Sequence, residues 1–379
     1  MKKSLIAVAV LAASGAAMAQ SSVTLYGIVD AWIGSKQTNG VTVVNGNQLA
    51  TTELRQTGVN SGGLSSSRWG LKGSEDLGGG LKAIFALESG INVDTGESSD
   101  SKRLFDRQAF VGLTSGFGTV SLGRQNGAYE SVRGTFFSAQ GNSPSFDATN
   151  GKQFSKANID DLAAFDRAVV PTTAQATAAA AALNTKGVAA SRIGAWAGYQ
   201  ARVDNSIRYA TPSISGFQAA VVYGFGEDKN TVAPTYNNGA TKNASISLSY
   251  ANGPIGVAVV HQDDELSPDF HMKNTGVGGY YDFGVAKAFL AYNEAKYDGF
   301  AKQNEWAVGV RAPLGATTLV AQYAQSKGDD FGKNTSFGLS AEYSLSKRTT
   351  AYAGFNQTKV EILNDNKNNA FGLGVRHTF

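Results

Sequence analysis

The amino-acid sequence predicts an all-β fold, a 16-stranded antiparallel transmembrane β-barrel built as a single domain. Three observations support this fold: apolar residues alternate with polar or small ones, short and long connections alternate, and an export leader precedes the first strand. Glycine is also abundant, with 45 of 379 residues, about 12% against an average of roughly 7%. Barrels run long as single domains, so the chain length fits one barrel.

Composition excludes several classes of protein. The chain has 33 Lys+Arg, 30 Asp+Glu, 3 His and no Cys. The lack of cysteine excludes a disulfide scaffold, thiolate metal sites and a cysteine nucleophile. A formal net charge of +3 is too small to indicate a nucleic-acid partner.

The N-terminus has the pattern of a secretory signal peptide. Lys2 and Lys3 are followed by an apolar stretch from Leu5 to Ala13 and by small residues that end at Ala19. We expect cleavage after residue 19, which leaves residues 20–379 as one barrel domain with a net charge near +1. No later window has the ~18 consecutive apolar residues of a membrane-spanning helix. The sequence therefore predicts an exported protein without helical spans.

Period-two alternation predicts strands along most of the remaining chain. In the segment 244–250, Ile246, Leu248 and Tyr250 alternate with serines, and the segment 335–343 repeats the scheme. Side chains of a strand point alternately to opposite faces. Each such segment is therefore predicted to be a strand with one apolar face and one polar or small face.

The connections between these segments alternate in length. Gly-, Pro-, Asn- or Ser-bearing segments predict seven tight turns, at 77–80, 115–118, 213–216, 252–255, 282–284, 313–316 and 344–347. Eight longer polar segments predict loops, at about 36–64, 94–102, 125–203, 227–243, 265–274, 297–302, 328–333 and 361–368. Seven turns and eight loops make fifteen connections, and hence sixteen antiparallel strands.

A membrane barrel explains this pattern better than a soluble sandwich. Short periplasmic turns on one side and long extracellular loops on the other are typical of outer-membrane barrels. Strands of about ten residues match a tilted span. In hydrocarbon every backbone polar group needs an internal partner, so the sheet must close. Sixteen strands leave an aqueous channel whose wall suits the Ser, Gly and charged residues of the polar face.

The chain resembles the general trimeric porins of Gram-negative outer membranes, particularly the beta-proteobacterial type. The resemblance rests on SSVTLYGIVDAW, SRWGLKGSEDLGGGLKAIFALESG, DRQAFVGLTSGFGTVSLGRQ, NSIRYATPSISGF and FGLGVRHTF. It implies a homotrimer in outer-membrane lipid and lipopolysaccharide, in which each subunit has a pore constricted by an infolded third loop. It also implies that the terminal Phe379 is an assembly signal that the barrel-assembly machinery reads.

The third loop is predicted to span residues 125–203, roughly 79 residues and far longer than ordinary loops. Its first part occupies the place where the family folds a segment into the lumen. By position we place Glu130 and Asp147 near the constriction, although the family's usual Pro-Glu-Phe-Gly-like tip is absent. Residues 169–191 have the composition of an Ala-rich, low-complexity insertion.

Strand parity predicts which basic residues face the lumen. A wide pore discriminates by size and by the charges that line its narrowest part. Where apolar neighbours face lipid, the intervening basic residue faces the water, and the resemblance adds Arg107 to the same cluster. The predicted basic set of the constriction is Arg68, Lys72, Lys82, Arg107 and Arg208.

No motif indicates catalysis, a cofactor or a resident metal. His261 and His271 flank an acidic segment that could bind a hard cation, but its spacing fits no EF-hand, and a solvated loop is the simpler interpretation. Ser99 and Lys102 form a Ser-x-x-Lys pattern without companion motifs, and no nucleophile elbow is visible. An enzymatic barrel is therefore disfavoured.

The leading hypothesis is a passive, water-filled channel for small hydrophilic solutes and ions, with mild anion preference and no cofactor. One alternative is a substrate-preferring channel of the same fold, and another is a structural or adhesive outer-membrane barrel. Small residues on the early strands, Gly27, Ala31, Gly73 and Ala83, would permit flat packing between barrels and agree with the expected trimer.

Overall fold

The computed structural model describes residues 22–44, 48–149, 195–196, 198–226, 242–267, 270–298, 300–329, 332–361 and 366–379. The predicted leader and the Ala-rich segment 169–191 lie outside these residues. The early strands are β1 (Ser22–Val44), β2 (Gln48–Ser61), β3 (Arg68–Gly78), β4 (Leu81–Gly90), β5 (Gln108–Ser115), β6 (Gly118–Asn126), β7 (Arg202–Ala210) and β8 (Phe217–Gly224). The later strands are β9 (Lys242–Asn252), β10 (Ile255–Ser267), β11 (Phe270–Asp282), β12 (Lys287–Tyr297), β13 (Gln303–Leu314), β14 (Thr317–Gly328), β15 (Gly332–Ser344), β16 (Thr349–Val360) and β17 (Asn366–Thr378).

These strands form one closed antiparallel sheet. Successive strands pair with each other except β2 and β3, and β1 pairs with β17, which closes the sheet. The segments β2 and β3 occupy one position in the wall, because Ala31–Val44 of β1 pairs with β2 while Ser22–Ile28 pairs with β3. Seventeen segments thus make 17 − 1 = 16 wall strands, and the predicted 16-stranded antiparallel barrel is confirmed.

The strands reach further than the alternation predicts. The segment 36–64, expected to be one long loop, is mostly the paired ends of β1 and β2. The expected loop 265–274 likewise contains the paired ends of β10 and β11. Outside the apolar band a strand pair keeps its hydrogen-bonded ladder but needs no lipid-facing apolar residues. The sequence signal therefore stops before the strand does.

The two faces of the wall differ as predicted. On β9, Ile246 and Leu248 point outward and are about half exposed, whereas Ser245 and Ser247 point inward and are buried. Exposed Val, Leu, Ile and aromatic side chains recur around the outer surface. In the part of the chain that the structure describes, no helix is both long and apolar enough to cross a membrane.

Two early glycines, Gly27 and Gly73, lie beneath aromatic rings of their own chain. A Cβ atom at Gly27 would lie 2.4 Å from the Phe379 ring, and one at Gly73 would lie 2.2 Å from the Phe85 ring. Both glycines are therefore covered by aromatic rings of their own chain. The rings fill the space that a missing side chain leaves, and flat packing between barrels stays a prediction.

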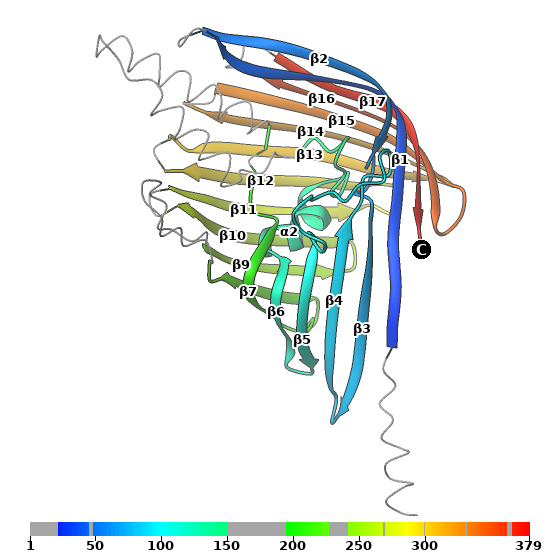
Figure 1. Cartoon of the computed structure of the whole chain (residues 1–379), viewed down its shortest axis with the longest axis vertical. Coiled ribbons are helices and arrows are strands. Elements are labelled where there is room, and N and C mark those ends of the chain that lie inside the picture. Colours follow the sequence, from blue (N-terminus) through cyan, green and yellow to red (C-terminus); the bar gives the residue numbers. More distant parts are fainter. Residues whose placement is uncertain are drawn as a thin grey trace, which may run out of the picture.

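The third loop turns into the barrel. Its helix α2 (Ala128–Val132) packs on β9 and β10, and the following π-helical turn η1 (Arg133–Phe137) packs on β11 and β12. Figure 1 shows the coil of α2 inside the curve of the sheet. Buried aromatic side chains anchor the loop, among them Tyr129, Phe137 and Trp196. This packing places the start of the loop across the lumen from β3–β5.

Candidate functional site

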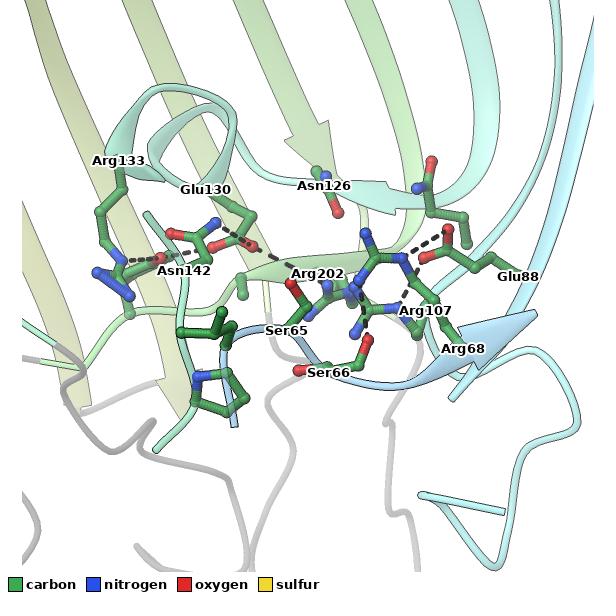
Figure 2. A pocket seen from close by; sticks show the side chains of 15 residues that line it. Ser65, Ser66, Arg68, Glu88, Arg107, Asn126, Glu130, Arg133, Asn142 and Arg202 are labelled. Carbon is green, nitrogen blue, oxygen red and sulfur yellow. Dashed lines mark hydrogen bonds and ion pairs between the residues drawn. The ribbon is translucent and has the colours of Figure 1, made fainter. Parts of the chain in front are cut away.

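A polar cavity of about 450 Å³ lies between the third loop and the inner wall of the early strands. Figure 2 shows its side chains converging from both sides. It is lined by Leu64, Ser65, Ser66, Arg68, Glu88, Arg107, Gln108, Asn126, Glu130, Arg133, Asn142, Pro144, Tyr199, Ala201 and Arg202. Four arginines and two glutamates give this lining a formal charge of 4 − 2 = +2.

The wall side of the cavity is a cluster of two arginines around Glu88. Glu88 is buried on β4, and its Oε1 accepts a 2.6 Å hydrogen bond from Arg107 Nε. Its Oε2 lies 3.6 Å from Arg68 Nε and accepts a 3.0 Å hydrogen bond from the Tyr26 hydroxyl. One carboxylate thus holds two guanidinium groups and offsets the charge of one.

The loop side of the cavity is organised around Glu130, which lies in α2. Glu130 Oε2 accepts a 2.5 Å hydrogen bond from the Tyr199 hydroxyl, and Oε1 accepts one of 3.2 Å from Asn142 Nδ2. Arg202 reaches Glu130 from β7 at 3.9 Å and, in Figure 2, lies between Glu130 and the Arg68–Arg107 cluster. Burial raises the pKa of Tyr199 well above its usual value, and the adjacent Glu130 adds to this effect. The hydroxyl therefore remains a donor.

Beneath this surface, Arg133 and Asp147 form a buried ion pair within the third loop. Arg133 Nη1 donates to Asp147 Oδ2 at 2.8 Å, and Arg133 Nε donates to the Tyr199 hydroxyl at 2.9 Å. Burial opposes the charge of Arg133, but Tyr199, Asp147 and Glu130 together raise its pKa, so it stays cationic. Asp147 also accepts hydrogen bonds from Ser138 and from Thr149. The pair fixes the fold of the loop that carries Glu130.

The structure brings together only some of the residues predicted for the constriction. Arg68, Arg107 and Glu130 line the cavity. Asp147 does not line the cavity, because its buried carboxylate forms an ion pair with Arg133 inside the loop.

Lys72, Lys82 and Arg208 also lie outside the cavity lining, further along the same side of the wall. The Lys72 ammonium lies 5.0 Å from the centre of the Tyr26 ring. Register places Lys82 opposite Thr114 and Arg208 opposite Ser121, toward the short-turn edge of the barrel.

Sequence reasoning missed several residues that line the cavity. Arg202 lies an even number of residues before Arg208 on β7, but the register shifts between Val203 and Ser206, so strand parity does not report the direction of its side chain. Strand parity places Glu88 in the lumen, although the predicted constriction set does not include it. Arg133, Asn142 and Tyr199 lie in the loop, where no periodic pattern reports the direction of a side chain.

The other sequence patterns have ordinary structural partners. Ser99 Oγ donates to Asp106 at 2.7 Å rather than facing Lys102. His271 Nδ1 lies 2.9 Å from Asp263, and the neighbouring Lys273 also reaches Asp263 at 3.5 Å. Within the described ranges, no three His, Asp or Glu side chains converge as metal ligands.

A closed membrane wall, a polar interior and a narrow arginine-lined passage define a channel for hydrophilic solutes. A family model described as Gram-negative porin matches residues 6–363. The chain belongs to this Gram-negative porin family. It is a passive channel protein of the outer membrane.

Its relatives agree with this family. An outer membrane porin protein of Bordetella pertussis is 34% identical over the whole of both chains. Outer membrane porin protein 32 of Delftia acidovorans is 34% identical, covering 93% of this chain and 88% of the relative. The fold is similar to that of an anion-selective porin from Comamonas acidovorans, with a TM-score of 0.69, 24% identity, and coverage of 95% of this chain and all of that one.

Proposed function

We propose that this porin is a general diffusion channel with mild anion preference and that the arginine-lined cavity is its constriction. The observation that carries this proposal is the excess of four arginines over two glutamates around the cavity. The anion-selective porin from Comamonas acidovorans is similar in fold and agrees with the proposal. We expect solutes to pass without chemical change.

The sign of the preference follows from the charges and their surroundings. Arginine keeps its charge at any working pH, so the basic side of the constriction is permanent. Low-dielectric walls focus the field of a few fixed charges, so they outweigh the net charge of the whole chain. Salt screens this field over about 10 Å at 0.1 M and about 3 Å at 1 M. The anion preference should therefore weaken as salt rises.

The zero-current potential across a salt gradient tests this proposal. The parent should prefer anions, and Arg68→Ser combined with Arg107→Ser should shift the potential toward cations. Arg55→Ser combined with Arg348→Ser is the matched control, because it removes the same charge from exposed positions outside the cavity. Cation preference in the parent, or an equal shift in both double variants, would refute the proposal.

We extend the proposal to assembly and export. Residues 1–19 would be removed as a signal peptide, and three barrels would associate as a homotrimer. A fold relative from Vibrio cholerae, OmpT, is described in a trimer form. Barrel-assembly machinery reading Phe379 and contact with lipopolysaccharide complete this proposal. Cross-linking of the detergent-solubilised protein should give a trimer, and a monomer alone would contradict it.

A further inference from the structure

The wall strand formed by β2 and β3 is interrupted by residues 62–67, here called the inturned segment. Its residues Leu64, Ser65 and Ser66 line the cavity inside the barrel (Figure 2). The fully buried carboxylate of Asp30 on β1 holds this segment. Its Oδ1 accepts the N–H of Gly63 at 3.0 Å, and its Oδ2 accepts those of Leu64 and Ser65 at 2.9 and 2.7 Å. The hydroxyl of Tyr352, on β16, also donates to Oδ1.

Aspartate satisfies the hydrogen-bond donors around position 30 better than asparagine would. Three N–H groups and one hydroxyl all donate to the carboxylate, which offers about four acceptor sites. Asparagine has the same shape, but it would turn an NH₂ group toward at least one of these donors. The backbone of Asp30 adds further bonds, because its carbonyl accepts from Gly62 N at 2.8 Å and from Ser67 Oγ at 3.0 Å. The inturned segment is thus fastened along its length to one residue.

The inturned segment supplies part of the cavity and positions an arginine. Leu64, Ser65 and Ser66 belong to the cavity lining. The carbonyl oxygen of Ser66 accepts a 2.9 Å hydrogen bond from Arg68 Nη1. The location of the Arg68 guanidinium therefore depends on the path of the backbone that Asp30 holds.

The inturned segment also receives the tip of the third loop. Ser143 Oγ donates to the carbonyl of Gly63, and Ser145 Oγ donates to that of Gly62, both at 2.7 Å. Phe146, fully buried, packs against Trp32, Leu64 and Tyr352. The inturned segment therefore contacts both the wall side and the loop side of the cavity.

We propose that Asp30 is a positioning residue of the pore, which fixes the inturned segment and through it both Arg68 and the tip of the third loop. The inference rests on the proposed function in that the cavity is the constriction. Asp30 does not line the cavity and touches no solute. Asp30 affects permeation indirectly, because it fixes the distance between the wall side and the loop side of the cavity, and solutes pass between these two sides.

Single-channel recording of Asp30→Asn and Tyr352→Phe tests the effect on the pore. Asp76→Asn is the matched control, because the exposed Asp76 carboxylate accepts a hydrogen bond from Gly78 N in its own turn, away from the cavity. We expect the parent and the control to show one steady open level. Both test variants should lose this steadiness, with extra conductance levels and lower anion preference. Heat-modifiable mobility verifies that each barrel is folded, and a folded Asp30→Asn channel with parental conductance, noise and selectivity would overturn the inference.

A thiol reporter measures the loop attachment without ion flow. The chain has no cysteine, so Ala148→Cys introduces a single thiol at a buried position of the third loop, two residues after Phe146, and keeps the Ser143 and Ser145 hydroxyl bonds. Adding Asp30→Asn should speed its modification by about tenfold, as expected when a hydrogen bond to a charged group is lost. If that variant does not fold, Tyr352→Phe provides the same comparison. An unchanged rate overturns the inference.

The two proposals fail separately. A parent channel without anion preference would refute the proposed selectivity, whereas the thiol rate would still report whether Asp30 holds the loop. Conversely, the parent could be anion-selective while Asp30→Asn changes neither the thiol modification rate nor the open level. That result would support the proposed selectivity and refute the positioning role.

Discussion

Gly27 and the terminal Phe379 close the barrel as a hydrogen-bonded pair. Gly27 N donates to a Phe379 oxygen at 3.0 Å, and Phe379 N donates to Gly27 O at 3.1 Å. The Phe379 ring then lies across the face of Gly27, where any side chain would also meet the carbonyl oxygen of Arg68. The seam between the first and last strands therefore needs a residue without a Cβ atom.

Gly27→Ala should destabilise the barrel. A Cβ there would lie 2.4 Å from the Phe379 ring and 2.7 Å from the Arg68 oxygen, so the seam must shift. Overpacking of this kind costs about 1–3 kcal/mol. Gly58→Ala is the control, because a Cβ at Gly58 meets no atom within 4 Å. Urea unfolding of the refolded barrels in detergent measures both, and equal stability of the two variants would contradict the account of the seam.

Glu88→Gln should increase anion preference. Glu88 bonds Arg107 and pairs with Arg68. Glutamine has no charge, so the substitution leaves both guanidinium groups without a compensating carboxylate. The zero-current potential should move in the direction opposite to that of the Arg68→Ser, Arg107→Ser variant. Glu53→Gln, on the exposed outer part of β2, should leave the potential unchanged. A shift toward cations in Glu88→Gln would show that the glutamate does not mask the cluster.

The basic side chains below the cavity should form an anion path along one wall. Among the described residues, Lys72, Lys82 and Arg208 have no acidic ion-pair partner, whereas Arg311 on β13 pairs with Glu342 at 2.7 Å. We expect Lys72→Gln with Arg208→Gln to reduce anion preference at low salt. Arg311→Gln with Glu342→Gln conserves the lumen charge, so this control should change the anion preference little. Equal potentials in the two double variants would exclude the path.

Breaking the Arg133–Asp147 pair should loosen the third loop. Arg133→Ala leaves the Asp147 carboxylate buried without its cation, and removing one partner of a buried pair costs about 3–5 kcal/mol. Lys242→Ala breaks the partly exposed pair with Glu265 and should cost no more than about 1 kcal/mol. Unfolding free energies of both variants measure the difference. Similar losses would mean that the buried pair contributes no more than a surface pair.

Alkaline pH should weaken the attachment of the loop at Tyr199. The pKa of Tyr199 in the folded protein is raised well above 10, chiefly by burial. The folded state therefore holds this proton more tightly than the unfolded state, so its contribution is complete below about pH 10 and is lost as pH rises further. Stability measured against pH should fall more steeply above pH 10 in the parent than in Tyr199→Phe. If the stability of the parent and of Tyr199→Phe falls in parallel above pH 10, Tyr199 does not have this role.

The sequence alone determined the wall and its two faces. Strand direction repeats every two residues, so Arg68 could be assigned to the lumen from its apolar neighbours without any knowledge of distant contacts. The same local rule identified the closing strand that ends at Phe379. The limits of the rule appear at β1 and β2, which continue as paired strands after the apolar alternation has ended.

Only the tertiary structure decided which charges meet. Glu88 and Arg107 come from neighbouring strands, but Arg202 and Glu130 meet because the third loop folds back across the lumen. The same fold buries Asp147 against Arg133 instead of exposing it to the passage. Asp30 and Tyr352 are 322 positions apart and touch only because the barrel closes. Backbone geometry imposes a local period on strands, whereas these contacts arise from loop packing and closure, which leave no period in the sequence.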